Sequence, residues 1–106
     1  MRTIYWKINQ LQVIPKDGSL IEVVQYAYYQ RIVSEGEYST FIEGKMLFPP
    51  PESSDFIPYK DITEDDIISW ILPNIDLEQT DIYLNYKLDS IIKENIYFPP
   101  LPFPNP

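Results

Sequence analysis

The sequence predicts an α+β fold: a three-stranded antiparallel β-meander with two C-terminal helices packed on one face, followed by an extended proline-rich tail. Apolar residues alternate with polar ones through most of the first half, and capping residues precede two helical patterns in the second half. Five prolines lie in the last eleven residues. We therefore expect a single domain over residues 1–95 and a C-terminal arm over residues 96–106.

The first predicted strand changes register along its length. Ile4, Trp6 and Ile8 alternate with polar or amphipathic residues, as in a half-buried strand. The apolar positions then move to Leu11 and Val13, which is a shift of one residue. A β-bulge accommodates such a shift, so we expect one between Ile8 and Leu11.

Turn residues separate the first strand from two more. Pro15-Lys16-Asp17-Gly18 predicts a turn, and a strand rich in Ile, Val and Tyr follows over residues 20–33. Residues 34–37 predict a hairpin to a third strand over residues 38–47. Gly44 lies inside that strand, where it predicts a bulge or a close approach of backbone.

Prolines 49–51 end the third strand because proline cannot donate into the hydrogen-bond ladder. The connection that follows is expected to be irregular. Phe56, Ile57 and Tyr59 are expected to hold it against the core.

Both helices begin with capping residues. Thr63 is the expected N-cap of the first, which has three carboxylates in its first turn and ends before Pro73. Asp76 is the expected N-cap of the second, with Gln79 at the capping-box position and Asn95 as a stop. The apolar positions are Ile67, Trp70 and Ile71 in the first helix and Leu77, Leu84, Leu88 and Ile91 in the second. Apolar residues that lie off this stripe are Ile82, Tyr83 and Tyr86.

Composition argues against several function classes. The net charge is −8 and the pI is near 4.3, which disfavours nucleic acid and anionic membranes as partners. The charge is uneven, because residues 1–62 sum to −2 and residues 63–106 to −6. Cysteine and histidine are absent, and no apolar run approaches a membrane span.

No residue constellation predicts catalysis, a metal site, a cofactor or a small-molecule substrate. The carboxylates of Glu64, Asp65 and Asp66 lack the alternating spacing of a calcium loop, and consecutive helical side chains diverge. They are better explained as the acidic first turn of a helix. Only three glycines are present, and none forms a phosphate-binding loop. We expect a protein that is not an enzyme.

Aromatic residues suggest both core and interface positions. Trp6 and Trp70 are expected to face one core from a strand and a helix. The run Tyr26, Tyr28 and Tyr29 places aromatic rings on both faces of the sheet, so that one face presents tyrosine to solvent or to a partner.

The tail is the strongest candidate for binding. Its prolines favour an extended, polyproline II-like conformation that spans roughly 30 Å. Large apolar side chains along it oppose a freely solvated terminus, although packing back onto its own domain is the alternative to docking on another subunit. The expected partner-binding residues are Tyr97, Phe98, Leu101, Phe103 and Tyr28.

Residues 56–71 carry a resemblance to a known group. They fit the pattern F-x-P-Y-x-D-[IL]-T-E-x-x-[IV]-[IV]-x-W-[IV], which recurs in short, mostly uncharacterised bacteriophage proteins. The similarity continues in the Trp6 strand, in the Gly18 turn, and in an end of the type Pro100-Leu101-Pro102-Phe103, where Trp is commoner at the last position. The run of prolines at 49–51 and a second helix richer in tyrosine depart from that pattern.

The resemblance implies a bacteriophage virion structural protein, made in the host cytoplasm and incorporated in the virion. A capsid decoration or cement subunit is the preferred role, with head, neck and tail positions left open. Its partners would be phage structural proteins, such as the major capsid protein, or copies of itself. The alternative is an accessory protein that inhibits a basic host factor through the acidic second half.

Overall fold

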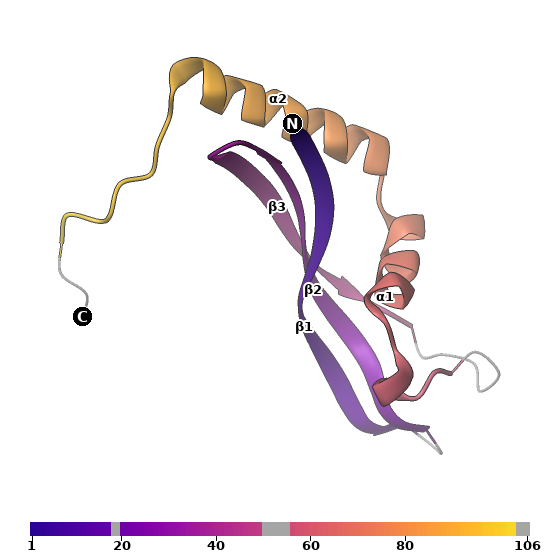
Figure 1. Ribbon diagram of the computed structural model, residues 1–106. Coiled ribbons are helices and arrows are strands. Elements are labelled where there is room, and N and C mark those ends of the chain that lie inside the picture. Colours follow the sequence, from indigo (N-terminus) through magenta and orange to yellow (C-terminus); the bar gives the residue numbers. More distant parts are fainter. Residues whose placement is uncertain (18–19, 50–55, 104–106) are drawn as a thin grey trace.

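The computed structural model describes residues 1–17, 20–49 and 56–103. They form one antiparallel sheet in the order β1-β2-β3 and two α-helices on one of its faces, as predicted. The elements are β1 (Arg2–Asp17), β2 (Leu20–Glu35), β3 (Tyr38–Leu47), the 3₁₀ turns η2 (Tyr59–Asp61) and η3 (Leu72–Asn74), and the helices α1 (Glu64–Ile71) and α2 (Leu77–Glu94). Figure 1 shows a strongly twisted sheet, with α2 crossing one end of the strands and α1 lying farther along them.

The predicted bulge in β1 is confirmed. Ile8 pairs with Tyr29 and Gln10 pairs with Tyr28, so that Asn9 is the extra residue. A second irregularity follows between Gln12 and Val13. These shifts keep apolar side chains on the helix-covered face along a strand of sixteen residues.

The predicted turn at residues 15–18 is wrong in part. Lys16 pairs with Ile21 and Asp17 pairs with Leu20, so β1 continues past Pro15 to Asp17. β1 is an edge strand, and a proline at an edge removes no hydrogen bond that a neighbouring strand needs. Gly18 lies outside the described residues.

Gly44 marks neither a bulge nor a close approach of backbone. The pairing of β2 with β3 is continuous, and Gly44 lies opposite Tyr29. A Cβ atom at Gly44 would lie 2.6 Å from Tyr29 Oη and 2.7 Å from Tyr29 Cζ. The glycine therefore makes room for the ring of Tyr29.

Replacing Gly44 with alanine is expected to destabilise the fold by about 1–3 kcal/mol, because the added methyl overlaps the Tyr29 ring. Thermal unfolding measures the loss. The double variant Gly44→Ala/Tyr29→Val provides the control, since the penalty should shrink when the ring is absent. An equal penalty in both backgrounds would contradict steric exclusion by Tyr29.

The core lies between the sheet and the helices in two clusters. The larger is centred on Ala27, Ile67 and Ile71, with Trp6 and Trp70 packed against it, as expected. The smaller joins Val33 to Leu84 and Leu88 under α2. The residues that α1 and α2 contribute to these clusters lie on the apolar faces predicted from their spacing in the sequence. Phe56 and Ile57 are half-buried, but Tyr59 is exposed and does not hold the connection to the core.

Helix boundaries follow the predicted caps. Thr63 Oγ1 accepts from the Asp66 N–H and Asp66 Oδ2 accepts from the Thr63 N–H, so the full capping box belongs to α1. Asp76 caps α2 through the Gln79 N–H, whereas the expected reciprocal bond from the Gln79 side chain is not formed. α2 ends at Glu94, and its C-cap residue Asn95 has a left-handed conformation with φ 53°.

The burial of Tyr29 makes the stability of the fold depend on pH at alkaline values. Its ring packs edge-on to Trp6 at 5.8 Å between centroids, and burial raises the pKa of its phenol above the ordinary value of 10.0. The pKa of the Tyr29 phenol is thus higher in the folded state than in the unfolded state. Its effect on stability is therefore fully present below a pH of about 10, and it is lost as the pH rises through the folded-state pKa.

Tyr29→Phe is expected to match the wild-type protein in thermal stability at pH 7 and to lose less stability than wild type above pH of about 10. Denaturant unfolding between pH 7 and pH 11 checks this. Tyr83→Phe on the exposed side of α2 is the control and should retain the wild-type slope. Identical slopes for Tyr29→Phe and wild type would exclude burial of the Tyr29 phenol as a source of alkaline sensitivity.

Candidate functional site

The candidate site is the extended segment after α2, which we call the arm (residues 96–106, described to Phe103). The left-handed residue Asn95 stops the helix, and its N–H donates to the carbonyls of Ile91 and Ile92. The hydroxyl of Tyr38 donates to Asn95 Oδ1, which ties the start of the arm to β3. From there the chain runs without helix or strand and leaves the domain on the side away from α1 (Figure 1).

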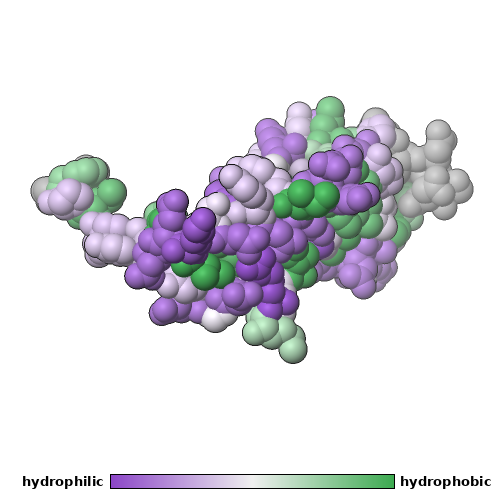
Figure 2. All heavy atoms as spheres, turned by 90° about the horizontal axis from the view of Figure 1, so that it is seen from above, coloured by the Kyte–Doolittle hydropathy of each residue, from purple (hydrophilic) through white to green (hydrophobic). Residues whose placement is uncertain are grey.

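The arm exposes the four apolar side chains that the sequence singled out. Tyr97, Phe98, Leu101 and Phe103 have exposed fractions of 77%, 80%, 68% and 63%. Figure 2 shows hydrophobic residues gathered at the outer end of the arm, separate from the body of the domain. Burying one such side chain is worth about 1.5–3 kcal/mol. The arm thus holds a large unused capacity for apolar contact.

A hollow of about 440 Å³ marks the base of the arm. It lies between Tyr97 and Phe98 on one side and the β2–β3 turn with Tyr38 and Ser39 on the other. Two of the four anchors therefore line a recess on their own domain without being buried in it. Leu101 and Phe103 lie farther along the arm and do not line the hollow.

Tyr28 is not brought together with the other expected binding residues. It lies on the uncovered face of the sheet, where its hydroxyl donates to Gln12 Oε1 at 3.3 Å. Lys45 Nζ lies 4.1 Å from the ring centroid of Tyr26 and 5.3 Å from that of Tyr28. Tyr28 thus belongs to a cation–π cluster behind the sheet, whereas the arm starts from the helix side.

Sequence reasoning missed an apolar row on the same uncovered face. Tyr5 pairs with Ile32, and Ile32 pairs with Phe41, so the three side chains cross all strands of the sheet. Tyr5 and Phe41 are each 45% exposed. Only the strand register places these residues side by side, and the sequence alone did not fix that register.

Sequence reasoning also missed an apolar groove at the far end of α2 from the arm. We call it the apolar groove; it has a volume of about 350 Å³. Three separate parts of the chain meet there: the start of β2, the connection after β3, and the end of α1 with η3. The main lining residues are Val23, Phe48, Phe56, Ile57, Trp70 and Pro73.

Two ion pairs position α2 and hence the start of the arm. Arg31 on β2 donates from Nε and Nη2 to the two carboxylate oxygens of Asp81, each at 3.0 Å, and its guanidinium lies 4.8 Å from the Trp6 ring centroid. The Arg31 side chain is only 10% exposed, so this bidentate pair is largely removed from water.

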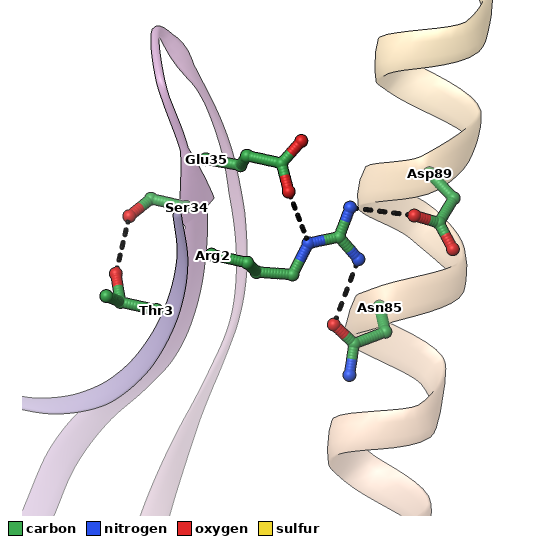
Figure 3. Close-up of polar contacts among 6 residues, drawn as sticks. All are labelled: Arg2, Thr3, Ser34, Glu35, Asn85 and Asp89. Carbon is green, nitrogen blue, oxygen red and sulfur yellow. Dashed lines mark hydrogen bonds and ion pairs between the residues drawn. The ribbon is translucent and has the colours of Figure 1, made fainter.

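Arg2 makes the second link, to residues in the middle and second half of α2 (Figure 3). Its guanidinium donates to Glu35 at 3.2 Å, to Asn85 at 3.1 Å and to Asp89 at 2.7 Å, so that it joins β2 to α2. The hydrogen bond to Asp89 raises the pKa of Arg2 further above its usual value. Because the Asp89 side chain is 66% exposed, water screens most of this interaction.

Half of the carboxylates in the acidic second half of the chain already form hydrogen bonds or ion pairs within the fold. Residues 63–106 carry eight carboxylate side chains, and four of them are engaged inside the fold. Asp66 and Asp76 cap helices, Asp81 pairs with Arg31, and Asp89 pairs with Arg2. These four are therefore partly neutralised or desolvated before any partner arrives.

Within residues 1–17, 20–49 and 56–103, no three acidic side chains are grouped so that they could hold a metal ion. Glu64, Asp65 and Asp66 occupy the first turn of α1, as the helix-start interpretation predicted. In the part of the chain that the structure describes, neither helix has the length and apolar character needed to span a membrane.

The chain belongs to the DUF7936 family, a domain of unknown function whose model matches residues 1–100. This match covers the whole sheet, both helices and the start of the arm. No curated protein and no solved structure shows significant similarity to the chain.

Proposed function

We propose that this protein is a non-enzymatic structural subunit of a bacteriophage virion that attaches to its neighbours through the arm. A capsid decoration or cement role is preferred. The observation that carries the assembly function is the arm itself: four large apolar side chains, 63–80% exposed, on an extended segment that leaves the domain. The virion setting rests on the resemblance of residues 56–71 to short bacteriophage proteins.

The physical properties of the arm suit docking. Prolines restrict the unbound chain, so less conformational entropy is lost when the arm is ordered on a partner. The segment from Asn95 to Phe103 carries no charged side chain, so its burial requires no desolvation of an ion. In a virion, many copies side by side would make a modest single contact sufficient.

The inhibitor of a basic host factor is the weaker proposal. It needs free carboxylates in the second half of the chain, and four of the eight are already bound within the fold. The salt dependence of binding distinguishes the two proposals. Binding of a basic factor through carboxylates should weaken steeply as the salt concentration rises, whereas the affinity of apolar docking through the arm should depend on salt much less.

Quantitative mass spectrometry of purified virions tests the proposal. The protein is expected in a fixed ratio to the major capsid protein or to another structural subunit, and the ratio should survive a wash at high salt. Absence from purified particles, or loss of the protein in that wash, would exclude a structural subunit held by apolar contacts.

A further inference from the structure

The chain carries two complementary features at opposite ends of α2. One is the arm, with its prolines and exposed aromatic side chains; the other is the apolar groove. Extended proline-rich segments are commonly recognised by grooves lined with aromatic residues, because the preformed segment loses little entropy on binding. The groove has that lining in Phe48, Phe56 and Trp70.

The size of the groove fits a few side chains of such a segment. Its volume of about 350 Å³ lies near the lower end of the range of small-ligand pockets, which begins at about 300 Å³. Two or three apolar groups fill that space, which corresponds to a short stretch such as Phe98 to Leu101. Neither this stretch nor the groove lining at Phe56, Ile57 and Pro73 carries a charged residue.

The arm cannot place its first anchors in the groove of its own chain. Asn74 lines the groove, and α2 then runs eighteen residues away from it, which is about 27 Å at 1.5 Å per residue. A fully extended chain gains at most about 3.6 Å per residue. Phe98 and Leu101 follow Asn95 by three and six residues, so they reach only about 11 and 22 Å back.

The length of β3 also shows that the start of the arm lies far from the groove of the same chain. The arm starts where Asn95 accepts a hydrogen bond from Tyr38, at the first residue of β3. The groove includes Phe48, just beyond the last residue of the same strand. Ten residues of strand span about 33 Å. The start of the arm and the groove thus lie at opposite ends of both α2 and β3.

We propose that the apolar groove of one copy binds the arm of a second copy of this chain, through Phe98 and Leu101. This inference rests on the proposed function, since it names the partner that the arm takes. A contact between two different surfaces of the same chain is heterologous. It closes into a dimer when two copies exchange arms, or continues into a ring or row when each arm passes to the next copy.

A mixing experiment with two variants of the full chain tests this. The arm variant is Phe98→Ser/Leu101→Ser, which keeps the groove. The groove variant is Ile57→Glu, which keeps the arm and changes a residue outside the helices and strands and outside both core clusters. Ser69→Glu, an exposed position on α1 at the groove, is a second groove variant in case Ile57→Glu does not fold.

Analytical ultracentrifugation up to about 1 mM protein is the measurement. The wild-type chain is expected to reach at least twice the monomer mass of 12.5 kDa, and each variant alone is expected to stay at 12.5 kDa. The mixture should form a one-to-one dimer, because one variant still offers an arm and the other a groove. Ile82→Glu on the exposed side of α2 introduces the same change elsewhere and should associate as wild type does.

The inference is overturned by a wild-type chain that stays monomeric, by groove variants that self-associate like wild type, or by a mixture that stays monomeric. These outcomes differ from a failure of the proposed function. If the wild-type chain is monomeric but still enters virions, and loses that ability without residues 96–106, the arm binds another protein. If the chain without the arm still enters virions, the proposed function fails as well.

Discussion

Asp81→Ala is expected to lower the free energy of unfolding by about 3 kcal/mol. The substitution leaves the guanidinium of Arg31 without its bidentate partner at a position where its side chain is only 10% exposed. Removing one partner of a buried ion pair costs about 3–5 kcal/mol, and the lower end applies because Asp81 itself is 27% exposed. Urea unfolding followed by circular dichroism measures the change.

Two further variants serve as comparisons for Asp81→Ala. Asp89→Ala breaks the exposed contact to Arg2 and should cost no more than about 1 kcal/mol. The double variant Arg31→Met/Asp81→Leu replaces both charges with apolar groups and should recover most of the loss. Equal destabilisation by Asp81→Ala and Asp89→Ala would show that the Arg31 pair is not the main polar link between sheet and α2.

Deleting residues 96–106 is expected to leave the domain folded and to remove its attachment to partners. The melting temperature should change little, because none of the buried core residues in the described part of the chain lies in residues 96–103. Docking should weaken at least about a hundredfold, since burying even two of the anchors contributes about 3 kcal/mol or more. Thermal unfolding and binding to the purified partner give the two readouts.

The control for this deletion keeps the length of the arm and removes only its anchors. Serine at Tyr97, Phe98, Leu101 and Phe103 should reproduce the binding defect of the deletion while the prolines remain. A deletion that unfolds the domain would show instead that the arm belongs to its own core.

Local signals in the sequence predicted the fold well. Thr63, Asp76 and Asn95 set the helix ends because capping depends on the backbone within three or four residues of the cap. The shift of apolar positions after Ile8 predicted the bulge, since side chains alternate strictly along a strand. These features depend on neighbours in sequence, and the sequence contains them.

Long-range features escaped prediction for the converse reason. The bidentate contact of Arg31 with Asp81 joins a strand to a helix fifty residues away, and no local pattern indicates it. Gly44 was misinterpreted because the space it provides is filled from the neighbouring strand, by Tyr29. The apolar groove likewise forms only when residues around Val23, Phe48 and Trp70 meet in three dimensions.

Sequence and structure agree that the chain after α2 forms neither helix nor strand as far as Phe103. Its prolines exclude regular helix and central strand, and its aromatic residues were expected to seek a partner. In the structure residues 96–103 are exposed and lie outside helix and strand, and Tyr97 and Phe98 line the hollow beside Tyr38. What the sequence could not supply was the distance between the arm and the apolar groove.

The most direct test of the proposed attachment through the arm is to count copies of the protein in purified virions. For the proposed virion subunit, host cells infected with phage that lacks the corresponding gene would supply either the full chain or the chain without residues 96–106, at equal levels. We expect the full chain in a constant ratio to the capsid protein and the shortened chain at background level, although it folds. Equal incorporation of the two chains would contradict the claim that the arm holds this protein in place.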